Sequence, residues 1–192
     1  MNLRVLLAGA LGGLALYIWL FISWALLPFH MESLNGIEHS ARLDALLLEM
    51  GAEPGLNYYP GTVEGMSREE HIQLAKSVPG IGIMSFSPDG MDMNDPMPHL
   101  RGLLGAIVAA LLVAQFMLLL PGRSGYGGRV LLCTLFGAAA FLCTSWINGG
   151  FFMYPMRHLL IEMSDGLIGW TLAGLVIAAL VKPQASAEPV DN

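Results

Sequence analysis

Residues 5–27 read VLLAGALGGLALYIWLFISWALL, and this run carries no charged side chain. About 20 helical residues cross the hydrocarbon core of a bilayer, which is roughly 30 Å thick. The run is longer than the apolar stretch of about 7–15 residues in a cleaved signal peptide. Its end, Trp24-Ala25-Leu26-Leu27, is also a poor match to the small-x-small pattern of a cleavage site. Residues 1–27 are therefore predicted to contain a transmembrane helix that is retained.

Three further apolar runs follow, at residues 103–120, 130–147 and 159–181. Their lengths suit a membrane crossing, and none of them alternates between polar and apolar residues as barrel strands do. In hydrocarbon the backbone must satisfy its own hydrogen bonds, which favours helices. The chain is 55% hydrophobic and 12% charged, whereas soluble domains carry about 25% charged residues. Residues 102–181 are thus predicted to hold transmembrane helices 2–4 of an all-α membrane protein, a four-transmembrane-helix bundle.

Positive charges at the ends of these runs predict the orientation of the helices. They flank one set of helix ends, at Arg4, Arg123, Arg129 and Lys182. The positive-inside rule assigns these ends to the cytoplasm, whereas a long segment crosses largely regardless of its charge. We expect cytoplasmic termini, including a tail at 182–192, and an outer segment at 28–101. In a bacterium, these predictions correspond to the inner membrane and a periplasmic segment.

The outer segment is predicted to form a small α+β extracytoplasmic domain between transmembrane helices 1 and 2. Helical periodicity covers Ser40–Met50, and the capping box Ser67-Arg68-Glu69-Glu70 opens a second helix that reaches about Ser77. Short strands are expected at Leu56–Tyr59 and Ile81–Phe86. The segment is too short for a large core of its own.

Histidine and methionine cluster at the predicted outer ends of the helices. The residues are His30, Met31, Met91, Met93, Met97, His99, Met156 and His158. Thioether and imidazole together suit a soft ion such as Cu(I), and imidazole also binds other transition metals. A site for copper or another transition-metal ion is therefore one hypothesis. The alternative is structural, because methionine fills apolar gaps and histidine can lie at the membrane interface.

Two carboxylates lie near the start of the fourth apolar run. His158, Glu162 and Asp165 are spaced i, i+4 and i+7, so they share one face of a helix. An ionisable group inside a membrane is by default a functional-site hypothesis, which makes these three residues a candidate ligand-binding site or proton relay. The favoured alternative is an interfacial network near the helix N-terminus, with Glu162 paired to Arg157 or Arg101.

No motif in the sequence identifies a family or a reaction. The two cysteines, Cys133 and Cys143, are ten positions apart in one apolar run, so on one helix they cannot form a disulfide. A net charge of −6 without a basic stripe argues against nucleic acid as a partner. Small residues such as Gly9 and Gly13 permit close helix contact.

Three functions are compatible with these features. The first, favoured by the lack of a catalytic motif in the sequence, is a non-enzymatic accessory subunit in the lipid bilayer. Its acidic outer domain or small-residue helix faces would then meet another membrane protein. The second is metal or cofactor binding at the outer membrane surface. The third is a small membrane enzyme or transporter that uses the carboxylates of helix 4.

Overall fold

A computed structural model describes residues 2–120 and 124–182 of the chain. These residues fall into two compact units. The helical unit lies within Met1–Leu34, Pro96–Ile147 and Pro155–Asn192. The small unit comprises Asn35–Asp95 and Asn148–Tyr154.

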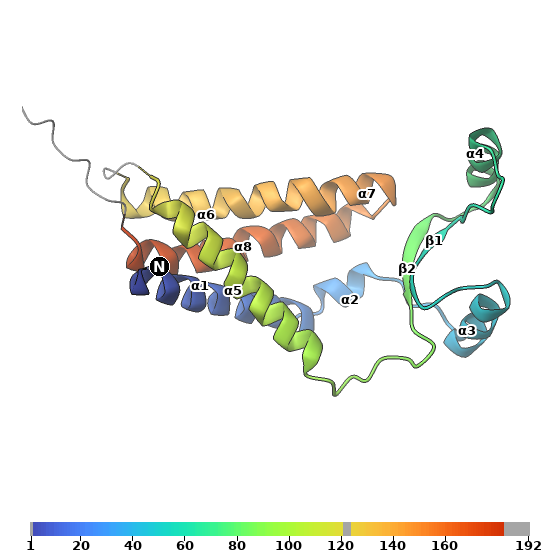
Figure 1. The fold of residues 1–192 in the computed structure, drawn as a ribbon, viewed down its shortest axis with the longest axis horizontal. Helices are drawn as coiled ribbons and strands as arrows, with labels where there is room; N and C mark the ends of the chain where they lie inside the picture. The colour runs from blue at the N-terminus through green and yellow to red at the C-terminus, as the bar shows by residue number, and fades with distance from the viewer. Residues whose placement is uncertain (1, 121–123, 183–192) are drawn as a thin grey trace, which may run out of the picture. The chain divides into compact units, whose positions relative to one another are not determined.

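Among the described residues, four helical segments are long and apolar enough to cross a membrane (Figure 1). They are Leu3–Leu26, Met97–Met117, Tyr126–Phe151 and Met156–Leu180. Each one matches a predicted run, so the four apolar helices are confirmed. The largest difference is the start of α5 (Met97–Met117), which lies six residues before the predicted Leu103 because proline is accepted in a first helical turn. The predicted stop at Pro121-Gly122 and most of the 182–192 tail lie outside the described residues.

Two of these segments contain π-helical turns that were not predicted from the sequence. In the first segment, α1 (Leu3–Phe21) continues into η1 (Ile22–Leu26), and the short helix α2 (Phe29–Ser33) follows. In the third segment, α6 (Tyr126–Phe141) continues into η2 (Leu142–Trp146) and then α7 (Ile147–Phe151). Single π-turns inside α-helices often occur at functional sites.

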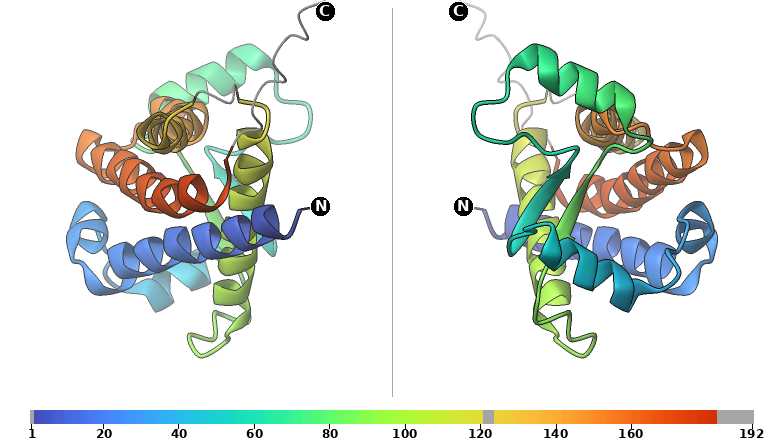
Figure 2. Two further views of the ribbon diagram at one scale, coloured as in Figure 1. Left: turned by 90° about the vertical axis from the view of Figure 1, so that its left-hand side faces the viewer. Right: turned by 90° about the vertical axis from the view of Figure 1, so that its right-hand side faces the viewer.

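Within the helical unit, α1 packs against both α5 and α8 (Met156–Leu180), and α8 also packs against α6. Figures 1 and 2 show α8 between α1 and α6, with α5 crossing α1. Small residues allow the close approach that the sequence predicted. A Cβ added to Gly13 would lie 2.4 Å from Ile107 Cα, and one added to Gly12 would lie 2.8 Å from Ile177 Cγ1.

Arg129, near the start of α6, is buried although it was predicted only as a flanking charge. Its Nη2 donates to the carbonyl oxygen of Ala178 at 2.9 Å, and its Nη1 donates to that of Ser124. The last carbonyls of a helix have no partner within the helix, and a cation is favoured beside them. Arg129 therefore stabilises the end of α8.

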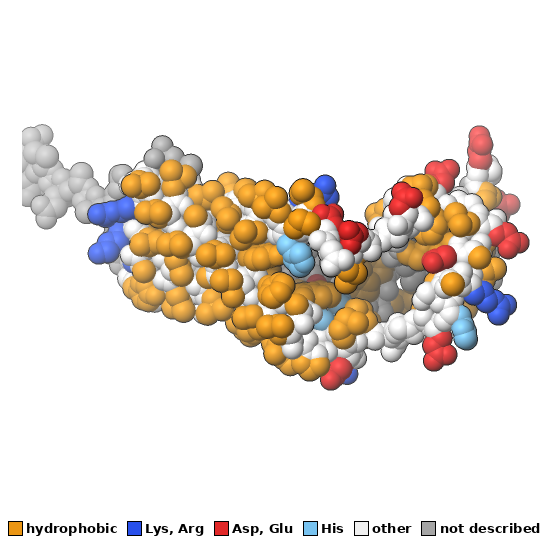
Figure 3. Space-filling view, turned by 90° about the horizontal axis from the view of Figure 1, so that it is seen from below, with side chains coloured by type: hydrophobic (Ala, Val, Ile, Leu, Met, Phe, Trp, Pro, Cys, Tyr) orange, Lys and Arg blue, Asp and Glu red, His pale blue; other side chains and the backbone are white. Residues whose placement is uncertain are grey.

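The small unit contains helices α3 (Ser40–Glu49) and α4 (Arg68–Ser77) and strands β1 (Gly55–Tyr59) and β2 (Gly82–Phe86). The strands pair antiparallel, with Gly55 opposite Phe86 and Tyr59 opposite Gly82. These elements agree with the prediction to within about one residue at each end. In Figure 3, acidic side chains gather on this unit, whereas hydrophobic side chains cover the visible face of the helical unit.

The capping box of α4 makes a pH-dependent contribution to the stability of that helix. Hydrogen bonds from the backbone N–H and then the hydroxyl of Ser67 hold the pKa of Glu70 below its ordinary value. A lowered folded-state pKa stabilises the helix above the unfolded-state pKa, and this stabilisation is lost as the pH falls through the folded-state pKa.

We expect the amide protection of α4 to fall as the pH is lowered through the carboxyl range, about 4.3 and below. Hydrogen exchange, referenced to intrinsic rates at each pH, measures this change. Glu70→Gln should weaken the cap and abolish its pH dependence, whereas Glu69→Gln is the matched control. Equal pH profiles for the two variants would contradict the assignment.

Candidate functional site

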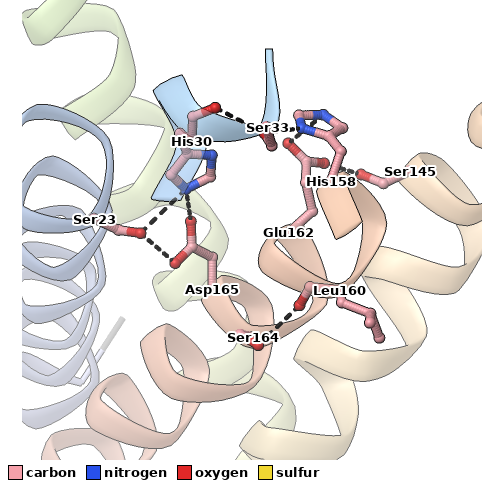
Figure 4. Close-up of polar contacts among 9 residues, drawn as sticks. All are labelled: Ser23, His30, Ser33, Ser145, His158, Leu160, Glu162, Ser164 and Asp165. Atoms are coloured by element: carbon pink, nitrogen blue, oxygen red, sulfur yellow. Dashed lines mark hydrogen bonds and ion pairs between the residues drawn. The ribbon is translucent and has the colours of Figure 1, made fainter. Parts of the chain in front are cut away.

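Asp165 of α8 lies in a buried polar cluster with Ser23 of η1 and His30 of α2 (Figure 4). The hydroxyl of Ser23 donates to Asp165 Oδ1 at 2.6 Å, and His30 Nε2 lies 2.8 Å from Asp165 Oδ2. Ser23 and His30 have no exposed surface, and Asp165 is 6% exposed. The carboxylate of Asp165 thus accepts two short hydrogen bonds, one from η1 and one from α2.

The imidazole ring of His30 also contacts the indole ring of Trp24. The two rings are stacked, with centroids 3.8 Å apart and planes inclined by 19°. His30 Nδ1 is buried and has no hydrogen-bond partner among the described residues. Because buried polar atoms are normally paired, often with an ordered water, this nitrogen is a natural site for one.

A second polar cluster surrounds Glu162, one helical turn before Asp165 (Figure 4). Ser145 of η2 donates to Glu162 Oε2 at 2.6 Å, and His158 Nε2 lies 3.8 Å from Glu162 Oε1. Ser33 Oγ lies 3.0 Å from His158 Nδ1 and donates to the His30 carbonyl oxygen at 2.7 Å. Ser33 therefore joins the second cluster to the first.

The predicted pairing of Glu162 with Arg157 is wrong. Arg157 Nη2 lies 2.6 Å from Glu32 Oε2, and both side chains are more than half exposed. Five positions separate Arg157 from Glu162, so the two side chains point about 140° apart around the helix at 3.6 residues per turn. Among the described residues, Glu162 instead contacts Ser145 and His158 and makes no ion pair with Arg101.

The Ser23–His30–Asp165 cluster differs from the triad of a serine hydrolase. In that triad the serine and the acid contact opposite nitrogens of the imidazole, so the histidine can remove the serine proton. Here both contact Nε2, and the serine proton is donated directly to the acid. The arrangement is suited to holding or transferring a proton on His30 and Asp165 rather than to activating Ser23 as a nucleophile.

The histidine side chains of the predicted metal site contact different side chains. His30 contacts Asp165, His158 contacts Ser33, and Nδ1 of His99 lies 3.1 Å from the hydroxyl of Tyr17. The methionines of that prediction are exposed, namely Met31, Met91, Met93, Met97 and Met156. Within residues 2–120 and 124–182, no group of three or more His, Cys, Asp or Glu side chains could hold a metal ion. The copper hypothesis stays a prediction.

Asp165 also borders a groove of about 680 Å³ in the helical unit. Its lining residues are Trp19, Phe29, Arg157, Leu160, Ile161, Ser164, Asp165 and Ile168. The lining is mostly apolar, and the volume is in the range of sites for small molecules and cofactors, about 300–1,000 Å³.

Three serines of these clusters, Ser23, Ser33 and Ser145, were not predicted from the sequence, although one pattern points to two of them. Residues 20–31 and 142–153 share Leu, Ser-Trp, Phe and Met at the same spacing. Each Ser-Trp pair lies in a π-helical turn, and each of these serines donates to a carboxylate of α8.

A second pair of matching segments begins α5 and α8. Residues 96–100 read PMPHL, and residues 155–159 read PMRHL. Since α1 packs with α5 and α6 packs with α8, the two helix pairs correspond in sequence and in packing. The position equivalent to Asp165, seven residues after the shared histidine, is Ala106 in the first pair.

No protein-family model, curated protein or solved structure matches this chain. What the protein does must therefore follow from the chemistry of these side chains.

Proposed function

We propose that this chain is a multi-pass membrane protein that exchanges protons between its outer surface and the buried carboxyl group of Asp165. Its four apolar helices would cross a bacterial inner membrane, with both termini in the cytoplasm and residues 28–101 in the periplasm. The positive-inside rule supports this orientation, because Arg4, Arg129 and Lys182 belong to helix ends on one side. This function belongs to the transporter or enzyme class rather than to accessory subunits.

The observation that carries the proposal is the burial of Asp165 with His30. Removing ionisable groups from water is costly, and an apolar replacement of a buried pair is often as stable or more stable. Such groups inside membrane helices typically mark proton or substrate pathways. A cluster that served packing alone would need neither a carboxylate nor an imidazole.

The second cluster provides the route to the surface. The side chains of His158 and Glu162 are 13% and 27% exposed, so they can exchange protons with solvent. Ser33 lies against His158 and the backbone carbonyl of His30, and the Nδ1 atom of that same histidine has no partner among the described residues. A water at this nitrogen would deliver a proton to Nδ1, while Nε2 releases its own proton to Asp165 Oδ2. The imidazole gains one proton and loses one, so its charge is restored.

Time-resolved infrared spectroscopy after a pH jump tests the proposal in proteoliposomes. The carbonyl stretch of protonated carboxylic acids should grow as the pH falls, and one component of it should be missing in Asp165→Asn. His158→Gln should slow the rise of this band by at least about tenfold without changing its final amplitude, because the general acid–base group that supplies the proton is lost. Glu38→Gln, which removes an exposed acid from the small unit, is the matched control.

Two results would contradict proton exchange at Asp165. One is a difference spectrum of Asp165→Asn that is identical to that of the unmodified protein at every pH. The other is an unchanged rate in His158→Gln, which would show that the second cluster is not the route.

A further inference from the structure

We infer that the groove beside Asp165 binds the uncharged ring of a membrane-soluble quinone or quinol. The site lies between α1, α2 and α8, all within the helical unit. The inference rests on the proposed membrane location and deepens the proposed proton exchange by naming the class of molecule that meets Asp165.

The walls of the groove fit a flat ring attached to an apolar chain. Trp19 and Phe29 supply aromatic surface, and aromatic rings favour stacked or edge-on contact with other rings. Leu160, Ile161 and Ile168 supply the apolar surface that a chain would cover. Since Trp19 and the three aliphatic residues of α8 lie on helices apolar enough to span a membrane, a molecule dissolved in the bilayer can enter from the side.

The charges around the groove favour an uncharged head. Arg157 is already paired with Glu32 at 2.6 Å, and Asp165 is held by His30 and Ser23. An anionic head such as a lipid phosphate would face the carboxylate of Asp165 without a free cation to balance it. An uncharged hydroxyl or carbonyl group does not meet this electrostatic repulsion and is less costly to bury than an anion.

The polar group of the groove matches a head that carries a hydrogen-bond donor. Asp165 can accept a further hydrogen bond, because each carboxylate oxygen has two lone pairs. A quinol hydroxyl would donate to Asp165. No electron transfer is implied, since binding and proton exchange alone account for these groups.

Quenching of tryptophan fluorescence by decylubiquinone tests the inference on the full chain purified in detergent. We expect saturable quenching that is lost in Ser164→Phe, where the larger side chain fills the groove. Asp165→Asn should weaken the apparent affinity by about tenfold, as expected for one charge-assisted hydrogen bond. Ala139→Phe, at an exposed position of α6, is the matched control and should bind normally.

A second variant guards against misfolding of Ser164→Phe. Trp19→Phe keeps an aromatic wall and should reduce the amplitude of the saturable quenching by removing the nearest fluorophore. Dioctanoylglycerol and phosphatidylglycerol serve as competitors. If either lipid reduces the quenching as strongly as an added quinol does, the groove is an ordinary lipid site and the inference is overturned.

The two proposals can fail separately. Absence of saturable quenching, with the Asp165 infrared band present, overturns quinone binding and leaves proton exchange standing. Saturable quenching with no Asp165 band supports the groove as a binding site and contradicts the proton relay.

Discussion

Asp165→Leu is expected to lower the free energy of unfolding by about 3–5 kcal/mol, the typical cost of removing one partner from a buried ionisable pair. The substitution removes the acceptor that His30 Nε2 and the Ser23 hydroxyl share, so these two buried groups keep only their contact with each other at 3.1 Å, and neither side chain has exposed surface. Unfolding in mixed micelles with increasing SDS, followed by tryptophan fluorescence, measures the loss. Asp165→Asn should cost much less, because the amide oxygen still accepts from one neighbour and the amide NH2 can donate to the other once the Ser23 hydroxyl or the His30 tautomer rearranges.

A second variant separates the energetic cost of leaving buried polar groups unpaired from the contribution of the whole cluster to stability. The triple substitution Ser23→Ala, His30→Leu, Asp165→Leu removes every polar group at once. It should recover most of the stability lost in Asp165→Leu, since apolar residues often replace a buried pair at no cost. If the triple variant were less stable than Asp165→Leu, the remaining polar groups would themselves stabilise the fold. The main support for a functional role would then be gone.

Gly13→Ala should produce the second large effect, a loss of about 1–3 kcal/mol from overpacking between α1 and α5. The added Cβ would lie 2.4 Å from Ile107 Cα and 2.8 Å from the Ala106 carbonyl oxygen. These are backbone atoms, so a rotamer change cannot relieve the overlap and the helices must separate. The same unfolding assay measures the loss.

Gly105→Ala is the matched control for this contact. Gly105 also lies in a membrane-length helix, but an added Cβ would meet nothing within 4 Å. Its substitution should be neutral or stabilising by up to about 1 kcal/mol, because alanine favours the helix more than glycine does. Similar losses for Gly13→Ala and Gly105→Ala would show that α1 and α5 are not packed at Gly13.

Hydropathy and periodicity predicted the secondary structure because both act locally along the chain. The four apolar helices and the two strands of the small unit were found from such local patterns, and the capping-box motif at Ser67 gave the start of α4. The π-helical turns were not predicted, since a single added residue in a helical turn leaves an apolar run unchanged.

The site was predicted only in part because its contacts join distant positions. His158, Glu162 and Asp165 could be grouped from their spacing on one helix. The contact between His30 and Asp165 spans 135 positions and exists only because α1 packs against α8. Spacing within one segment carries no information about that packing, so His30 was assigned to a metal hypothesis instead.

The correspondence of the two helix pairs has a consequence for how the site could work. Ser23 and His30 come from the first pair and its extension, whereas Asp165 comes from the second. The acid therefore meets its partners only where the two halves touch. Any rotation of one half against the other changes the surroundings of Asp165, and by linkage any change in its charge biases that rotation to the same extent.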